Sequence, residues 1–592
     1  MMLLEVVEFN IKTKKSFANG LNGNARLGYK QFFEDDFYCR GNGSIALNYR
    51  GDKISAYVNY GAWAGSGFNQ LKEKMFIRDT LRRNTEMNSD DDFISHSAKF
   101  GLDYFLNRKN TIGAIANFSY RKSEDDGITN TTVFDGGPVS LDSSRTESAN
   151  GRTFASGSLN LNHTYNFDKE QQELTTNLDY RRYTSKPWQN QNTQFFKSNS
   201  YPEIFKNNTN QTIDIYGVKV DYVHPISDRM RLEGGGKIEQ TNTDNRVVRW
   251  DSDGTIGRDT LNLNESNDFK YYERISALYA NYSWSIDSMW SVKAGLRYEN
   301  TWSKGDWITE GTVTKKKYND LFPTLFIGFN PSQNHNFGLS YTRRINRPGY
   351  WNLNPFRRYI DPYTYFQGNP NLDPAYGHRV NLEYNLFRFI NLSLGYSHTK
   401  GMMIQIPESL PNNMTAYRQG NFGKTQNISF NIHLSQVPVA KWWSMNVSIW
   451  MAYIMNENYS YSNSNFGGNI WTNNTFTLSK TVKAELEFWA NTPMVWGYFE
   501  TKFQGSLNLG VKKSFWNNIG SLSIYFDDIL GTNKFNATTR IDGIQREVEN
   551  LWESCAIRFA FTYRFGQANQ SAIRRNVGQQ DDADRVGGGG DK

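Results

Sequence analysis

Apolar and polar residues alternate strictly in the segment 555–565. Its apolar side carries Ile557, Phe559, Phe561, Tyr563 and Phe565, and its other side carries Arg558, Ala560, Thr562 and Arg564. A period of two residues predicts a β-strand whose two faces meet different surroundings. The same eleven residues would also fit a half-buried strand of a soluble sandwich, so the rest of the chain has to decide between these structures.

The alternation recurs in residues 158–167, 290–299, 337–341, 427–435 and 502–512. The polar positions hold Lys, Arg, Asn and Glu, which indicates that one face is wet. We expect outward, lipid-facing positions at Phe503, Leu507, Leu509, Ile428, Phe430, Leu296 and Phe561, and lumen-facing positions at Lys512, Asn431, Lys293 and Arg558. No long segment follows the helical period of 3.6 residues.

Two kinds of connection alternate along the chain. Ten are short: 51–52, 107–109, 168–171, 226–228, 286–288, 331–334, 388, 436–441, 481–482 and 517–518. The others are rich in Asn, Ser, Asp and Gly, and we expect long loops at 123–152, 185–211, 241–268 and 345–378. Outer-membrane barrels have short periplasmic turns and long outer loops. Ten turns joining eleven hairpins predict 22 strands, with both chain ends on the periplasmic side.

Composition narrows the class of protein. Aromatic residues make up 15% of the 592 residues and hydrophobic residues only 38%. No apolar run approaches the ~18 residues of a membrane helix, whereas a barrel needs apolar residues only at alternate positions. The net charge of +7, without a basic run, gives no sign of a nucleic-acid partner.

Cys39 and Cys555 offer no disulfide framework, and we expect both to be reduced. Aromatic residues beside the short turns, such as Trp284, Trp290 and Trp516, predict an interfacial girdle.

The fold class expected is therefore all-β: a 22-stranded antiparallel transmembrane β-barrel in the outer membrane, in contact with outer-membrane lipid.

One segment carries a resemblance to a known family. Residues 343–348 read Arg-Arg-Ile-Asn-Arg-Pro, residues 353–356 read Leu-Asn-Pro-Phe, and residues 368–374 read Gly-Asn-Pro-Asn-Leu-Asp-Pro. This pattern resembles the TonB-dependent receptor superfamily, and most closely its outer membrane protein beta-barrel family, in which Ala375 here replaces the usual acid. The segment would be the seventh extracellular loop. Its motif residues are expected to be structural: Arg347, Pro348, Asn354, Pro355, Gly368, Asn369, Pro370, Leu372 and Pro374.

The resemblance also implies a division of the chain. Residues 6–15 are similar to the last strand of the plug domain in these receptors, so residues 1–15 are expected to be a plug remnant and 16–565 the barrel. The tail 566–592, polar and containing the run 587–590 of glycines, is expected to be a disordered periplasmic extension. Residues 1–5 do not resemble a signal peptide. A truncated gene product is the expectation that follows.

Two other patterns in the sequence do not indicate a binding or catalytic site. Gly234-Gly235-Gly236-Lys237 lacks Walker spacing, and the seven histidines show no metal-ligand spacing. No catalytic set, cofactor site or metal site is predicted, and an enzyme is not expected. Five arginines of the loop segment could either attract anionic groups such as phosphate or pair with lumen acids, the second being favoured: Arg343, Arg344, Arg347, Arg357 and Arg358.

The function implied by the resemblance is the barrel of an outer-membrane TonB-dependent receptor for nutrient uptake, with an extracellular ligand that the sequence does not identify. TonB-type energy coupling would require a full-length form with a plug. The closing strand 555–565 would be read by the barrel-assembly machinery of Gram-negative bacteria. A plugless passive pore or surface-binding barrel is the alternative. A soluble β-protein such as a lectin array would need polar outer faces.

Overall fold

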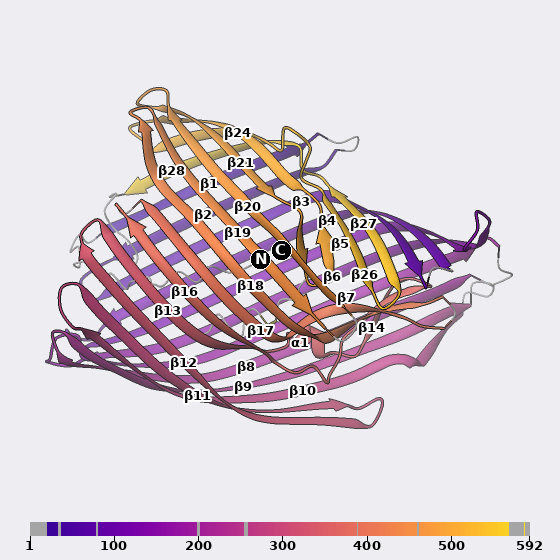
Figure 1. Cartoon of the computed structure of the whole chain (residues 1–592), viewed down its shortest axis with the longest axis horizontal. Coiled ribbons are helices and arrows are strands. Elements are labelled where there is room, and N and C mark those ends of the chain that lie inside the picture. The colour runs from indigo at the N-terminus through magenta and orange to yellow at the C-terminus, as the bar shows by residue number, and fades with distance from the viewer. Residues whose placement is uncertain are drawn as a thin grey trace.

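The computed structural model describes residues 20–33, 37–78, 81–197, 202–253, 258–387, 389–411, 413–458, 461–566 and 585–586. These residues form a single wall of long, tilted strands that closes on itself (Figure 1). The first thirteen strands are β1 (Gly20–Phe32), β2 (Cys39–Arg50), β3 (Ile54–Ile77), β4 (Leu81–Phe105), β5 (Asn110–Asp135), β6 (Ser140–Asn166), β7 (Glu173–Phe195), β8 (Glu203–Ser227), β9 (Met230–Asp253), β10 (Arg258–Ser285), β11 (Trp290–Trp307), β12 (Thr312–Ser332) and β13 (His335–Asn346).

Nine more strands complete the wall, and each pairs antiparallel with its neighbours. They are β16 (Ala375–Leu386), β17 (Ile390–Ser409), β18 (Thr415–Ala440), β19 (Trp443–Glu457), β20 (Ser462–Thr477), β21 (Val482–Asn491), β24 (Gln504–Phe515), β25 (Gly520–Asp527) and β28 (Ala556–Gly566). Strand β28 pairs with β1 from Phe32↔Ala556 to Asn22↔Gly566, and this pairing closes the barrel. The described residues therefore form the 22-stranded antiparallel barrel that the turn count predicted.

Nine of the ten short connections predicted from the sequence lie where one wall strand ends and the next begins. The tenth, residue 388, lies outside the described residues. The outer connections differ from the prediction. Residues 123–152, 185–211 and 241–268 were expected to be loops, and that expectation is wrong: the strands β5 to β10 continue through them and leave only brief links. Beyond the membrane a strand has water on its outer face, so Asn, Ser and Thr replace the apolar positions while the backbone ladder continues. Of the four segments predicted to be long loops, residues 345–378 contain one.

Side-chain exposure agrees with the outward assignment of Phe503 and of four strand positions, whereas Leu507 and Phe561 are only partly exposed. Leu296, Ile428, Phe430 and Leu509 are large apolar residues that stay exposed in the isolated chain, as lipid-facing positions should. Lys293 forms an ion pair with Glu233 of β9 at 3.7 Å, and Arg558 forms one with Asp527 of β25 at 3.1 Å. Aromatic side chains stand at the short-turn end, where Trp290 stacks on Phe329 with ring centroids 4.3 Å apart.

The glycine run 234–236 lies inside β9 and shows why small residues are needed in this wall. Gly235 pairs with Tyr279 of β10, and a Cβ at Gly235 would come within 2.6 Å of the Tyr279 hydroxyl and of the Val220 carbonyl oxygen. The tyrosine ring crosses over the glycine, and its hydroxyl donates to Asp221 on β8. The run is thus a packing feature of the strand, in line with the rejection of a phosphate loop.

Six further strands and one short helix belong to the outer loops. They lie inside the barrel or extend its wall outward. The seventh outer loop carries α1 (Tyr350–Leu353), β14 (Arg357–Asp361) and β15 (Thr364–Gln367). The last two outer loops carry β22 (Met494–Trp496), β23 (Phe499–Thr501), β26 (Phe535–Ile541) and β27 (Ile544–Trp552). Strand β23 pairs with β26, and β27 pairs with the outer half of β3. The paired loop strands extend the barrel wall outward on the side where the wall strands are short.

Among the described residues, no helix is long and apolar enough to cross a membrane. Neither Cys39 nor Cys555 forms a disulfide in the structure. The expected plug remnant, residues 1–15, lies outside the described residues, and so does most of the tail. At Arg585 and Val586 the structure differs from the expected periplasmic disorder, because both residues are buried inside the barrel. Their partners are buried lumen groups that the sequence pattern of the tail gave no reason to connect with it.

Candidate functional site

The seventh outer loop, residues 347–374, folds into the barrel and crosses its lumen. It leaves β13, contacts the inner faces of strands from β4 to β12, pairs with β18 and returns to β16. We refer to it as loop 7. Its contacts are side chains of the lumen wall, so the sequence of distant strands determines where it lies.

The entry into loop 7 is held by Arg347, the first residue after β13. Its Nη2 donates to Glu299 Oε2 of β11 at 2.6 Å and to Thr301 Oγ1 at 2.9 Å, and its Nε donates to the Tyr318 hydroxyl of β12 at 3.2 Å. Both charged side chains are nearly buried. Charge-assisted bonds of this kind are stronger than neutral ones, so they fix the direction in which the chain leaves the wall.

The helix α1 inserts an apolar anchor into the lumen. Tyr350 and Leu353 are buried against Ile213 and Ile215 of β8, and they form a cluster with Phe269, Tyr271, Leu372 and Val586. The Tyr350 hydroxyl also donates to Thr241 Oγ1 of β9 at 3.1 Å. An apolar cluster on the inner face of a barrel is unusual, since that face is otherwise polar. Here it provides the surface on which loop 7 packs.

The hairpin β14–β15 contacts strands β10 and β5 of the barrel wall. Arg357 Nη1 donates to Glu265 Oε1 at 2.9 Å, and the Tyr359 hydroxyl donates to the other oxygen of that carboxylate at 3.0 Å. Burial, followed by the nearby Glu265 charge, raises the pKa of Tyr359 to about 12, so this hydroxyl keeps its proton near neutral pH. Asp361 is fully buried and accepts from Thr131 Oγ1 of β5 at 2.8 Å.

Strand β15 then joins the wall itself. It pairs in parallel with β18, from Thr364↔Thr415 to Gln367↔Arg418. Beside this junction the buried Arg83 of β4 donates to the carbonyl oxygens of Tyr363 at 3.2 Å and Asn413 at 3.1 Å. A buried guanidinium that donates to two loop carbonyls ties loop 7 to the outer connection between β17 and β18.

The second half of the predicted loop motif shapes the return. A Cβ at Gly368 would collide with the Asn354 carbonyl oxygen. Asn369 donates its backbone N–H to the Asn352 carbonyl oxygen at 2.7 Å and its Nδ2 to the Gln419 carbonyl oxygen at 3.1 Å. Pro370 occupies the second position of the turn that the Leu372 N–H closes on Asn369, which is where proline fits best.

Three carbonyl groups of the motif accept side-chain donors. Pro355 accepts from Gln367 Nε2 at 3.0 Å, Leu372 accepts from Lys316 Nζ at 2.7 Å, and Pro348 accepts from Arg585 Nε at 3.1 Å. Pro374 ends the loop directly before β16. The structure thus brings the nine predicted residues into one loop, where their described contacts are made within the protein. A structural role for the motif remains a prediction of the sequence.

Pairing with acids, the favoured interpretation of the loop arginines, holds for three of the five. Arg343 lies 3.3 Å from Asp320, Arg347 pairs with Glu299, and Arg357 pairs with Glu265. Arg358 stands over the Phe366 ring, 5.1 Å from its centroid. Sequence reasoning did not single out their partners, because acids at lumen positions look like any other polar residue of an alternating strand.

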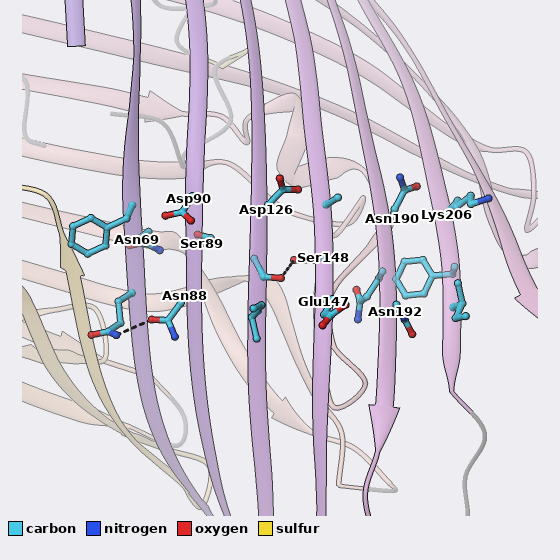
Figure 2. Close-up of a pocket in the computed structure, with 18 of the residues that line it drawn as sticks. Asn69, Asn88, Ser89, Asp90, Asp126, Glu147, Ser148, Asn190, Asn192 and Lys206 are labelled. Atoms are coloured by element: carbon cyan, nitrogen blue, oxygen red, sulfur yellow. Dashed lines mark hydrogen bonds between the residues drawn. The ribbon is translucent and has the colours of Figure 1, made fainter. Parts of the chain in front are cut away.

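Two hollows open on the wall. Figure 2 shows the first, of about 900 Å³, across the outer halves of β3 to β8; the labelled side chains around it are polar, among them Asp90, Asp126, Glu147 and Lys206. The second, of about 860 Å³, lies lower on the wall from β1 to β7 and includes Arg26, Lys99, Asp179 and Arg181. No group of three or more His, Cys, Asp or Glu that could hold a metal ion occurs in the part of the chain that the structure describes.

Residues 165–563 match the outer membrane protein beta-barrel family. The chain belongs to this family. The resemblance seen in the loop motif is therefore confirmed, and with it the location of the chain in the outer membrane. No curated protein matches the sequence.

Solved structures of siderophore and uptake receptors share the fold at low identity. The siderophore receptor PiuA of Acinetobacter baumannii has a TM-score of 0.59 at 11% identity, covering 93% of this chain and 82% of that one. The ferric yersiniabactin uptake receptor FyuA of Yersinia pestis gives 0.55 at 12%, covering 93% and 81%. The siderophore receptor PirA of Pseudomonas aeruginosa gives 0.54 at 10%, covering 93% and 82%. At such identities the similarity concerns the fold.

Proposed function

We propose that this chain is the barrel of a TonB-dependent outer-membrane receptor that takes up a scarce nutrient and is not an enzyme. The observation that carries the proposal is a closed 22-stranded wall whose seventh outer loop is anchored across the lumen. A barrel of this size is too wide to fill with strand side chains, so it is either a channel or a plugged receptor. A constriction built from ion pairs favours controlled passage over free diffusion.

The fold supports the same reading, since the solved structures that share it are receptors for siderophores. In a receptor of this class a plug fills the lumen below the outer loops, and energy reaches it through TonB. The lower hollow, with its polar residues from β1 to β7, offers a wall of the kind on which a plug could pack.

Uptake measurements test the proposal in cells that carry the intact gene. Strains with and without the gene would be compared for growth and radiolabel uptake on panels of ferric siderophores, glycans and peptides. A receptor predicts saturable uptake of one class that stops when a protonophore collapses the membrane potential. Uptake that resists the protonophore and rises linearly with concentration would contradict the proposal and favour the passive pore.

We also propose that β28 is the strand read by the barrel-assembly machinery. Its last aromatic residue, Phe565, pairs with Gly23 of β1 at the closing seam. Phe565→Ala should lower the amount of folded barrel in the outer membrane, whereas Phe503→Ala, on an outward residue beside β24, should not. Equal amounts of folded barrel for both variants would exclude this role.

A further inference from the structure

Two residues of the C-terminal segment, Arg585 and Val586, lie inside the barrel against the start of loop 7. Their exposed fractions are 9% and 8%. Strand β28 ends at Gly566, so these residues belong to a part of the chain that follows the barrel in sequence. Nothing in the receptor function requires this placement, which therefore needs its own explanation.

The Arg585 side chain is held on three sides. Its Nη1 and Nη2 donate to the two oxygens of Glu273 at 2.5 and 3.2 Å, and its Nε donates to the Pro348 carbonyl oxygen at 3.1 Å. The guanidinium carbon stands 4.3 Å from the centroid of the Tyr350 ring. A two-pronged carboxylate, a carbonyl and an aromatic face match the planar fork of arginine, and a lysine would fit them poorly.

Glu273 shows that the lumen is built to receive a cation at this point. It lies on β10 with 3% of its surface exposed, and the Tyr271 hydroxyl donates to its Oε1 at 2.9 Å. A neutral hydroxyl cannot balance a buried negative charge, and an unpaired carboxylate is costly in such a place. The nearby Arg347 is engaged by Glu299, and within the described part of the chain Arg585 is the cation that pairs with Glu273.

The backbone and the next residue add specificity. The Tyr350 N–H donates to the Arg585 carbonyl oxygen at 3.0 Å, and a Cβ on Gly349 would lie only 3.3 Å from that oxygen. Val586 packs into the apolar cluster that contains Ile213 and Leu353. The site thus binds an arginine side chain, the backbone carbonyl of that arginine and the apolar residue that follows it.

We propose that Glu273, Tyr350 and the Pro348 carbonyl form a guanidinium-binding site inside the lumen, and that its ligand is Arg585 of this chain's own C-terminal segment. Once docked, Arg585 and Val586 strap the start of loop 7 to strands β8 and β10. The strap is separate from nutrient recognition and would exist whichever nutrient the receptor takes.

Limited digestion of the purified full chain in detergent tests the site, because trypsin cleaves after arginine. Release of the peptide that begins at Val586 would be followed by mass spectrometry. In the folded chain this cleavage should be slower than in the heat-unfolded chain by on the order of tenfold or more. Glu273→Gln should restore most of the rate. Arg585→Lys keeps a trypsin site and should be cleaved faster than the native residue.

Glu487→Gln is the matched control. Glu487 is a carboxylate of β21 that accepts from Trp471 Nε1 at 2.9 Å and has no described contact with the tail, so its loss should leave cleavage at residue 585 unchanged. Heat-modifiable migration in gels confirms that each variant still forms a closed barrel. Cleavage of the native chain at the unfolded rate, or no acceleration in Glu273→Gln, would overturn the proposal.

A photo-cross-linking amino acid at position 586 provides a second measurement that does not depend on protease access. Cross-links should map to peptides that contain Leu353 or Ile213. Cross-links confined to the short-turn end of the barrel would also refute the site. Failure of either experiment would leave the uptake test of the receptor function untouched.

Discussion

At the scale of single residues, loop 7 is held by buried charges that look unremarkable in the sequence. Glu265 and Glu299 stand in polar stretches of β10 and β11, and each pairs with an arginine of the loop about 50 to 90 positions later. An acid becomes informative only when its partner is known. The arginine-rich segment could be recognised from the sequence, whereas Glu265 and Glu299 could not, because alternation gives the face of a residue and not its partner.

Arg347→Lys tests the entry anchor. Lysine keeps the charge but cannot reach Glu299, Thr301 and Tyr318 together, so the docked loop should lose about 1–2 kcal/mol of stabilisation. Hydrogen–deuterium exchange of residues 350–372 should become faster by about tenfold. The exposed Arg379 of β16 provides the control, since Arg379→Lys should leave this exchange unchanged. Equal exchange in both variants would show that Arg347 does not anchor the loop.

At the scale of elements, the alternating pattern predicts where strands cross the membrane and misses where they continue beyond it. Leu296 and Ile428 identify lipid-crossing positions because hydrocarbon demands apolar side chains. Residues 123–135 and 140–152 remain in β5 and β6 although their outer face is polar. Turn residues correctly predicted the nine short connections that lie within the described residues, because a chain reversal has local requirements. The lengths of the outer strands depend on pairing with neighbours, which local sequence does not report.

Leu296→Arg tests the lipid face at β11. An arginine near the middle of the bilayer should reduce folding stability by about 2–4 kcal/mol, measured by denaturant titration of the barrel in lipid vesicles. Lys293→Arg, on the lumen face of the same strand, is the control and should change stability little. If Leu296→Arg were as stable as the control, the assignment of that face to lipid would be wrong.

The outer sheet that joins β27 to β3 should be sensitive to acid. Glu73 of β3 accepts from Arg546 of β27 at 2.5 Å. Burial raises the pKa of this carboxyl, but Arg546, Arg83 and the Tyr417 hydroxyl outweigh burial, and the pKa falls below its ordinary value of 4.5. A lowered pKa means that the pair stabilises the sheet fully above 4.5 and loses this effect as the pH falls through the lowered value.

Exchange of the β27 amides should therefore accelerate as the pH falls below 4.5 and through the lowered pKa of Glu73, after correction for the intrinsic exchange rate. Glu73→Gln should show faster exchange already at pH 7 and little further change in acid. Parallel pH profiles for the native chain and the variant would rule out Glu73 as the origin of the acid response.

At the scale of the whole molecule, the barrel is a tall wall on the side of β3 to β12 and a short wall at β24, β25 and β28. Loop strands complete the short side, while loop 7 crosses the interior (Figure 1). The closed ring could be predicted from the sequence by counting turns. The occupied lumen could not, because it depends on contacts between residues such as Thr131 and Asp361 that lie 230 positions apart.

Removal of loop 7 tests the constriction. Asn346 and Ala375 face each other at the end of the β13–β16 pair, so residues 347–374 can be replaced by an Asn-Gly turn without disturbing the wall. In planar bilayers the shortened barrel should conduct in large, steady steps, and the 592-residue chain should conduct several-fold less. Equal conductance would mean that loop 7 leaves the passage open.

The anchoring of loop 7 has a consequence for the order of folding. Arg83 of β4 reaches Tyr363 across 280 positions, and Arg585 reaches Glu273 across 312. Contacts this far apart in the chain form late, since the intervening segments must first be placed. A partly assembled barrel would thus hold its lumen open, with Glu265, Glu273 and Glu299 still hydrated. Docking of the loop would be a late event in maturation, after the strands from β4 to β12 and β18 have been placed.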